Sequence, residues 1–522
     1  MTSSEPNIER AEGSYESRYG RFLLSSKDFV QQFCHMYARR LNQTKPQLKA
    51  AAKRKWTSAD LVIFDQVIDS EGAVGSDCVL IGTLYKEMES KPSVLDEFKD
   101  FNGLMGATTM ADNFTGKKDK LILEDDSGRV ALHGVGITAE TPGLVTGVMI
   151  AVKGYLDDLG GFQVKDWLFC GETLNALSSS SGSTTSDQNS ATGKSGSPKL
   201  LLVSGLAFGS PDASPFTAQL LADFIGGTLG GEDQQAKSAS ICRVIVVGNS
   251  VCADLTCPEE DFKKETKEEK ENKSNSSSSS SNASSSRKKG GANTNISETE
   301  AHLRQLDTWL AQILGTCPVD LMPGPSDPSS FILPQQPLHP CMLQNSSRFS
   351  TLENCPNPHE AMVCGKLILG HSGQPIDDLR RNVDPAHLAG LVASANASSS
   401  SQSSASASVS AAAPPPPPPS SSSSSSTSSA GTEAGGASAD SADSNDADFP
   451  RAEKESLALL AKSLQWAHLC PTAPDSLQCY PYLEEDPFVM DTCPDVLFVG
   501  NRSGFATDLV RVLARDPKQP DA

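Results

Sequence analysis

The chain has 522 residues, and its 64 acidic against 44 basic residues give a net charge of −20 at pH 7. This length suits two or three domains. The negative charge repels a phosphate backbone and argues against a main DNA-gripping role, although a local basic face stays open.

The 13 cysteines include no CxxC pair, and the closest two, Cys252 and Cys257, have no flanking histidine. We therefore expect reduced thiols and no zinc or iron–sulfur site made by this chain alone. No signal peptide is recognisable, and no stretch approaches the roughly 18 apolar residues that cross a bilayer. These features predict a soluble intracellular protein with no membrane partner. The run 53–55 (KRK) is either a nuclear signal or, more commonly, a solvated helix face.

Three stretches consist almost entirely of Ser, Gly, Ala, Pro or mixed charge, namely 177–197, 258–294 and 394–449. Chains of this composition bury too little apolar surface to fold, so we predict disordered inserts there. Before them, residues 24–42 show helical spacing and predict a helix lying on a domain; its apolar positions are Phe29, Phe33, Met36, Tyr37 and Leu41.

Residues 78–169 have strand patterns. The segment 78–88 is rich in β-formers, 120–134 reads as a hairpin with its turn at 125–128, and 144–156 pairs with 161–171. Short strands joined by tight turns predict a small closed barrel of the OB type. Few aromatic residues and mixed charge favour a structural or protein-binding use over single-strand binding.

Apolar strands alternate with amphipathic helices after residue 198. We predict buried strands at 199–205 and 242–249, an amphipathic helical stretch at 216–227, and a helix that Ser297 caps and that ends at Leu314. Further strands run into glycine turns at 318–324, 366–370 and 495–501. Continuous apolar strands fit a layered α/β domain.

The ends of these strands resemble the calcineurin-like metallophosphoesterases. In that family the strands end in Asp-x-His, Gly-Asp, Gly-Asn-His-Asp/Glu and Gly-His-x-His, and these side chains hold two metal ions. Here the corresponding turns read SGLA (204–207), GN (248–249), GPSD (324–327) and GHSG (370–373). The ligand positions that the resemblance implies are Gly205, Ala207, Asn249, Pro325, Ser326, His371 and Gly373.

Most of these side chains cannot bind a metal. Glycine, alanine and proline offer no ligand atom, and an amide or hydroxyl is a weak substitute for a bridging carboxylate. His371 alone cannot hold two divalent ions, and the plainer interpretation is an ordinary turn histidine. Asp327 is kept, but its family counterpart orients a histidine and binds no metal. We therefore predict no catalytic residue, no metal and no cofactor.

A barrel followed by an inactive phosphoesterase domain resembles the B-subunits of eukaryotic replicative DNA polymerases, most closely those of polymerase delta. The long segments LPQQPLHPCM (333–342) and PTAPDSLQCYP (471–481) carry that likeness. It implies an α+β multidomain chain with an N-terminal helical segment (1–45), an OB-fold domain (46–176) and a layered α/β calcineurin-like phosphoesterase domain (198–522). Two of the inserts lie inside this last domain.

The resemblance also implies function and partners. It indicates a nuclear, non-catalytic scaffold of DNA replication and repair that binds the C-terminal cysteine-rich module of the polymerase delta catalytic subunit. It implies a third subunit that reaches the sliding clamp, so that contact with the clamp is indirect. In some members the polymerase zeta catalytic subunit is a further partner. DNA is expected to bind weakly at most.

Two alternatives stay open beside this interpretation. One is an active metal-dependent phosphoesterase or nuclease, against which the missing ligands argue. The other is the B-subunit of polymerase alpha or epsilon, against which LPQQPLHPCM argues. The family continues with further strands beyond the turn that holds Gly500, Asn501 and Phe505, whereas this chain ends at Ala522. We expect an exposed apolar sheet edge there unless another segment covers it.

Overall fold

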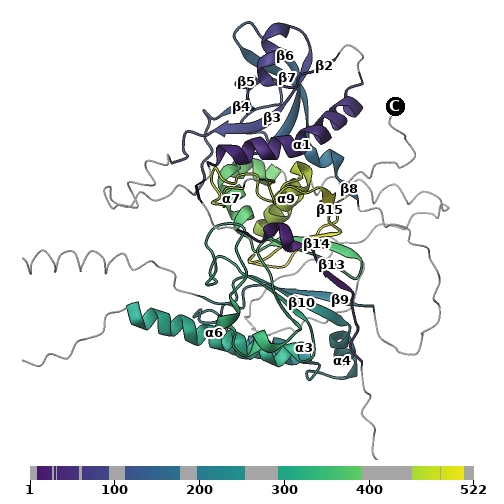
Figure 1. Ribbon diagram of the computed structural model, residues 1–522, viewed down its shortest axis with the longest axis vertical. Coiled ribbons are helices and arrows are strands. Elements are labelled where there is room, and N and C mark those ends of the chain that lie inside the picture. Colours follow the sequence, from purple (N-terminus) through teal and green to yellow (C-terminus); the bar gives the residue numbers. More distant parts are fainter. Residues whose placement is uncertain are drawn as a thin grey trace, which may run out of the picture.

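The computed structural model describes residues 9–510 except 26–28, 31, 58–60, 93–111, 177–196, 253–291, 391–449 and 483. The three predicted disordered inserts fall almost wholly in these gaps and so lie outside the described residues. A barrel occupies one end of the molecule, two sheets with α3 and α6 occupy the other, and α7 and α9 lie between them (Figure 1). No helix in the described part of the chain combines the length and apolarity that crossing a bilayer requires.

The barrel closes with the strand order β3-β4-β5-β7-β6-β3, in which only β5 and β7 run parallel. A short strand, β2, extends the order beside β3. The predicted hairpin and strand pair both form, so the expected small closed barrel is confirmed. Its strands are β2 (Val62–Ile63), β3 (Cys78–Glu87), β4 (Lys120–Glu124), β5 (Arg129–His133), β6 (Met149–Leu156) and β7 (Gly161–Phe169).

Helix α1 spans Cys34–Lys55 and lies between the barrel and the chain segment 467–490. The predicted helix over 24–42 is therefore wrong at both ends. Phe29 and Phe33 precede the helix and are exposed, whereas Met36 and Leu41 are buried. The helix also runs without a break through residues 45 and 46, the expected domain boundary, because its buried face continues to Ala52.

Two four-stranded sheets form the rest of the core. One is parallel, in the order β12-β11-β10-β9, and the other is mixed, in the order β1-β13-β14-β16. Their bounds are β9 (Lys199–Val203), β10 (Ile241–Val247), β11 (Val319–Met322), β12 (Leu352–Asn354), β1 (Tyr15–Ser17), β13 (His359–Val363), β14 (Lys366–His371) and β16 (Val496–Val499). A further pair joins β8 (Asn175–Ala176) to β15 (Thr492–Cys493).

The two sheets pack face to face, and helices cover their outer faces. Ile245 and Met322 from the parallel sheet share a buried cluster with Ile368 and Phe498 from the mixed sheet. The outer helices are α3 (Pro215–Gly226), α4 (Glu232–Ala239), α6 (Ala292–Leu314), α7 (Gln374–Asn382) and α9 (Arg451–Trp466), and short 3₁₀ turns lie at Tyr19–Phe22, Val67–Ala73, Cys170–Thr173, Pro340–Met342 and Ser346–Arg348. This arrangement gives the layered α/β core expected from the strand pattern.

Two predictions about this core are wrong. Strand β9 is not buried on both faces: it lies at the edge of its sheet, and Leu202 is 39% exposed. The helix predicted from Ser297 begins at Ala292, so residues 292–294 belong to α6 and not to a disordered insert. The first error concerns what lies beside a strand in space, which its own pattern does not report.

Buried polar contacts fasten α1, the barrel and the C-terminal part of the core together. The Arg40 guanidinium, which is fully buried, donates Nε to Asp486 Oδ2 at 2.6 Å. Its Nη atoms donate to the carbonyl oxygens of Gly147 (3.0 Å), Pro471 (2.8 Å) and Ala473 (2.7 Å). We call this group of residues the Arg40 junction; one side chain there binds three chain segments that are distant in sequence.

Candidate functional site at the strand ends

The turns that follow β9, β10, β11, β14 and β16 meet at one place. Parallel strands bring their carboxyl ends to the same edge of a sheet, and the packing of the two sheets brings both edges together. Gly205 N donates to Gly248 O at 3.1 Å, and Gly500 N donates to His371 O at 3.0 Å. A Cβ on Gly248 would lie only 2.8 Å from the Cα of Gly324. We call this group of turns the strand-end cluster.

Backbone and amide bonds hold the predicted positions 207, 249 and 326 together. Ala207 N donates to Asn249 O at 2.9 Å, and Ser326 N donates to Asn249 Oδ1 at 3.1 Å. The Ser326 hydroxyl donates to Val251 O at 2.8 Å. Pro325 lies beside them and is exposed. The Asn249 amide is therefore engaged in holding a neighbouring turn.

Asp327 fixes the turn after β11. Its two carboxylate oxygens accept from Val251 N and Gly324 N, both at 2.8 Å. Burial raises the pKa of the Asp327 carboxyl to about 6, and the bonds from backbone N–H groups oppose that rise. This geometry agrees with a turn-fixing side chain that points at the backbone.

His371 is fully buried, and its Nδ1 accepts from Gly373 N at 3.1 Å, while its Nε2 has no hydrogen-bond partner. Burial, with a smaller contribution from Arg502, lowers the pKa of His371 to about 3, so the imidazole is neutral at physiological pH. A side chain at position 373 would be strained, because φ is +114°, and its Cβ would lie 2.6 Å from Arg502 Nη2 and 3.0 Å from Gly500 O, so Arg502 would have to move. Arg502 itself forms a bidentate pair with Asp377.

A network of neutral amides supports the cluster, and sequence reasoning missed it. Asn357 Nδ2 donates to Gln335 Oε1 (2.9 Å) and Ser372 Oγ (2.8 Å). Gln335 Nε2 donates to Gly324 O at 3.1 Å, and Gln374 Nε2 donates to Gln335 Oε1 at 2.8 Å. Gln335 lies in LPQQPLHPCM, so one of the two long segments that carried the resemblance binds the turns directly.

Asn501 is a second residue that closes the cluster. Its Nδ2 donates to Ser372 O at 2.7 Å and to Val247 O at 3.3 Å, and its backbone N donates to Ser204 Oγ at 3.0 Å. A signal for it existed in the sequence. A Gly-Asn pair ends β16 as it ends β10, and Asn501 and Asn249 both take left-handed φ values, 56° and 52°.

The strand-end cluster therefore contains the predicted positions, but among their side chains only His371 carries a strong metal-ligand atom. The remaining groups are backbone, amide or hydroxyl groups that bond to one another. Such an arrangement holds the shape of five turns, and it offers neither a carboxylate bridge for two cations nor an activated nucleophile.

Another set of possible metal donors lies between the sheets, where atoms of Asp320, Cys355 and His359 are all within 4.8 Å of one another. Asp320 is already engaged, because Oδ1 accepts from Arg243 Nη2 at 2.6 Å and Nε at 2.9 Å while Oδ2 faces His359 Nε2 at 3.3 Å. His359 and Arg243 lower the pKa of Asp320 despite its burial. The guanidinium thus supplies the positive charge that a metal ion would bring, and the residues do not fit a metal site.

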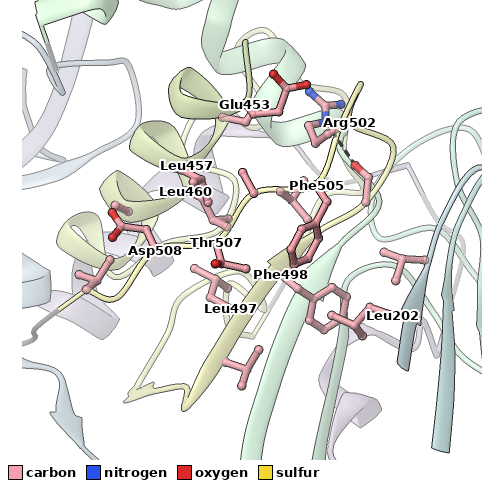
Figure 2. A pocket seen from close by; sticks show the side chains of 18 of the residues that line it. Leu202, Glu453, Leu457, Leu460, Leu497, Phe498, Arg502, Phe505, Thr507 and Asp508 are labelled. Atoms are coloured by element: carbon pink, nitrogen blue, oxygen red, sulfur yellow. Dashed lines mark hydrogen bonds between the residues drawn. The ribbon is translucent and has the colours of Figure 1, made fainter. Parts of the chain in front are cut away.

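An open groove of about 630 Å³ lies between α9, the edge strands β9 and β16, and residues 504–510. Figure 2 shows Leu457 and Leu460 of α9 on one side of it and Phe505 near Phe498. Phe505 is 82% exposed and Val496, on β16, is 41% exposed. Within the described residues, β16 therefore ends its sheet and presents the exposed apolar side chain of Val496. The walls of the groove are mostly aliphatic, so the groove does not have the composition of a catalytic site.

Several cations on the barrel, and Lys55 at the end of α1, are paired with carboxylates, whereas Lys53 and Arg54 in the same last turn of α1 form no ion pair with described residues. Lys165 Nζ lies 2.6 Å from Asp77 Oδ1, and Lys55 Nζ lies 3.1 Å from Asp166 Oδ1. The same holds for three other pairs: Lys118–Glu89, Lys120–Glu87 and Arg129–Glu124. A groove that tracks a nucleic-acid backbone needs unneutralised positive charge. The paired cations are therefore partly neutralised, and the expectation of weak DNA binding at most stays a prediction.

Comparison with known proteins connects both parts of the fold to one family. The family of the DNA polymerase alpha/epsilon B-subunit matches residues 200–507, and the DNA polymerase delta subunit OB-fold domain matches residues 32–167. The second match confirms the OB prediction for the barrel.

Full-length relatives give the same result. The chain is 30% identical to the DNA polymerase delta small subunit of Oryza sativa subsp. japonica, over 97% of this chain and 91% of that one. It is 31% identical to the small subunit of Arabidopsis thaliana (97% and 89%) and 28% identical to that of Saccharomyces cerevisiae (94% and 84%). The chain therefore belongs to the B-subunit family of DNA polymerases, among the delta small subunits.

Proposed function

We propose that this chain is a non-catalytic accessory subunit of the DNA polymerase delta complex and serves there as a scaffold in DNA replication and repair. The observation that carries the proposal is similarity to delta small subunits over nearly the whole chain. These relatives also favour a delta subunit over the B-subunit of polymerase alpha or epsilon. Membership of such a complex implies a nuclear location.

The strand-end cluster is, in this proposal, a phosphoesterase metal site that has lost its ligands. Support comes from the convergence of the predicted positions and from the neutral groups that occupy them. Asn249 Oδ1 holds the backbone of Ser326, and Arg502 lies where a side chain at position 373 would need to be. An active phosphoesterase or nuclease would need carboxylates at this point.

The scaffold would hold two partners. One is the C-terminal cysteine-rich module of the delta catalytic subunit, or in some settings that of polymerase zeta. The other is the third delta subunit, which reaches the sliding clamp. Holding both on one rigid body raises their effective concentration for each other without any chemical step. The Arg40 junction supports this role, because it fastens the barrel to the core by buried bonds.

Co-purification tests the scaffold. The tagged full-length chain is co-expressed with the delta catalytic subunit, either whole or without its cysteine-rich module. We expect recovery of the whole subunit and a loss of at least tenfold without the module. Equal recovery in the two cases would contradict the assigned contact, and no recovery in either would overturn the scaffold itself.

A separate assay tests whether the chain binds metal and hydrolyses a phosphodiester. The purified chain is incubated with Mn²⁺ and bis(p-nitrophenyl) phosphate, and bound manganese is measured after desalting. We expect neither stoichiometric manganese nor metal-dependent release of nitrophenol. Finding both, and losing both in a His371→Asn variant, would support the phosphoesterase alternative.

A further inference from the structure

Two cysteines from different sheets meet beneath the N-terminal strand. Cys242 lies in β10 of the parallel sheet and is 6% exposed, whereas Cys364 lies in the turn between β13 and β14 and is exposed. Their Sγ atoms are 3.9 Å apart although 122 positions separate them in sequence. The pair is therefore a product of sheet packing and spans the two halves of the core.

The N-terminal segment crosses directly over this pair. A Cβ added to Gly13 would lie 2.8 Å from Cys364 Sγ and 2.9 Å from Cys242 Sγ, which leaves no room for a side chain. Next to it, Cys364 N donates to Ser14 O at 2.9 Å. The two sulfurs thus lie under a backbone segment that contacts both of them.

The same segment is fastened to the parallel-sheet half of the core. Ala11 N donates to Ala239 O at 2.7 Å, and Arg10 Nη1 donates to Ile241 O at 2.9 Å. Strand β1 then pairs with β13 of the other sheet. The N-terminal segment consequently bridges the two elements that carry the cysteines.

Cys364 occupies a backbone position that its residue type does not favour. It forms a two-residue hairpin turn with Gly365, because Val363 pairs with Lys366, and φ is 51° at Cys364 and 73° at Gly365. Asparagine, aspartate or glycine is the usual first residue of such a turn, because each tolerates the left-handed conformation.

We propose that Cys364 and Cys242 are a peroxide-modification site that closes to a reversible intramolecular disulfide. The Cys364 thiolate attacks one oxygen of a peroxide, the O–O bond breaks, and a sulfenic acid forms with release of hydroxide. Cys242 sulfur then attacks the Cys364 sulfur, the S–O bond breaks, and water leaves. In all, two thiols lose two electrons and two protons, and one H₂O₂ becomes two H₂O.

The difference in exposure between the two cysteines indicates which of them reacts first. Cys364 is the more exposed of the two residues, although its sulfur lies beside the N-terminal segment, and it meets the oxidant first. Burial, together with the neighbouring thiol, raises the pKa of Cys242 to about 11, so Cys242 is a protonated thiol at neutral pH, and its proton leaves with the hydroxyl of the sulfenic acid as water. Bonding requires the sulfurs to approach by roughly 2 Å, to the ~2.05 Å of a disulfide, and to release the bond from Cys242 to Lys199 O.

The disulfide would join the two sheets covalently beneath the N-terminal segment. It would close a loop of more than a hundred residues, which restricts the unfolded chain and stabilises the folded one. A reducing compartment would reopen it, so the bond would respond to oxidant exposure and would not be a permanent cross-link.

The experiment uses the purified full-length chain, reduced and then treated with a small excess of hydrogen peroxide. Remaining thiols are alkylated, and peptides are analysed by mass spectrometry without reduction. We expect a linked Cys242–Cys364 peptide, no dimer on a non-reducing gel, and a rise in Tm on the order of 5 °C that dithiothreitol reverses. Cys364→Ser and Cys242→Ser should each abolish the linked peptide and the Tm rise.

Cys341→Ser is the matched control, because Cys341 is another exposed thiol; it should leave both readouts unchanged. Circular dichroism of the reduced variants shows that each is folded. The exposed turn position makes Cys364→Ser the variant that keeps the test valid should Cys242→Ser fail to fold. Alkylation of Cys242 while Cys364 forms dimers or a sulfinic acid would overturn the proposal.

Discussion

The Arg40 junction and the strand-end cluster are both buried and polar, yet the first is built on a full charge and the second mostly on neutral groups. In the junction a full positive charge meets Asp486 at 2.6 Å and three carbonyl oxygens. In the cluster, amides such as Asn249 and Gln335 bond to backbone and to each other. The chain thus keeps buried charge where it fastens segments together, and uses mostly neutral groups where a metal site would be.

Desolvation accounts for the difference. A buried carboxylate needs a nearby positive charge or several N–H donors, because removing it from water is costly. Asp486 has Arg40, which holds the pKa of that carboxyl far below its usual range despite burial. In the cluster the Asp327 carboxylate is compensated by backbone N–H donors alone, and burial raises its pKa to about 6. Without metal ions, further carboxylates there would lack compensation.

Breaking the junction should have the largest effect. Arg40→Met keeps the length of the side chain but leaves three carbonyl groups buried without this donor and Asp486 buried without its guanidinium partner, with only His468 Nε2 and Phe488 N still bonded to the carboxylate. We therefore expect a loss of about 3–5 kcal/mol in the free energy of unfolding. Urea unfolding followed by circular dichroism measures it. Arg39→Met, at an exposed neighbouring position on α1, should cost under about 0.5 kcal/mol. Similar losses in the two variants would refute the role given to the junction.

Disrupting the amide network around Gln335 should lower the free energy of unfolding by less than breaking the Arg40 junction. Gln335→Leu removes the donors to Gly324 O and Ser330 O and the acceptor of Asn357, so we expect a loss of about 1–3 kcal/mol by urea unfolding. Gln219→Leu replaces an exposed glutamine and serves as the control, with an expected change near zero. A loss as large as that of Arg40→Met would remove the distinction between the two regions.

The contribution of the buried His371 can be measured as a change of stability with pH. The pKa of His371 is lowered to about 3 in the folded chain, so between about pH 6.5 and 3 only the unfolded chain gains this proton, and stability falls as the pH falls. At pH 5.5 the loss from His371 is about 1 kcal/mol relative to pH 8.

The comparison is between the wild-type chain and His371→Asn in urea at both pH values. His468, whose pKa is lowered to about 4, and Asp327, whose raised pKa acts with the opposite sign, are present in both chains. The difference therefore isolates His371. We expect the variant to lose about 1 kcal/mol less on acidification, and identical losses would refute a buried neutral imidazole.

Removing a surface ion pair on the barrel should have the smallest effect on stability. Lys165→Ala removes a cation that is half exposed and paired with Asp77, so we expect a stability change below about 0.5 kcal/mol. Fluorescence anisotropy with a labelled single-stranded oligonucleotide should show affinity within about twofold of wild type at about 0.15 M salt. A tenfold drop would instead identify a nucleic-acid face on the barrel.

Much of the fold follows from local pattern. Alternating apolar residues and tight turns predicted the barrel, and glycine turns after apolar strands placed Gly205, Asn249 and Gly373 at strand ends. Parallel strands bring such ends together, and the resemblance to the metallophosphoesterases identified which of these turns correspond to ligand positions. The segment LPQQPLHPCM likewise indicated the family without geometry.

The amino-acid sequence by itself indicated most barrel strands, the strands β9, β10, β11, β14 and β16 and the helices α3 and α6, because periodicity is a local property. The family resemblance then showed which ligand side chains the strand ends lack. Only the tertiary structure decided that β9 lies at an edge, that Arg40 meets Asp486, that Gln335 binds the turns, and that Cys242 meets Cys364. Each of these depends on which distant segments lie side by side, and sheet order and packing set that after local structure has formed.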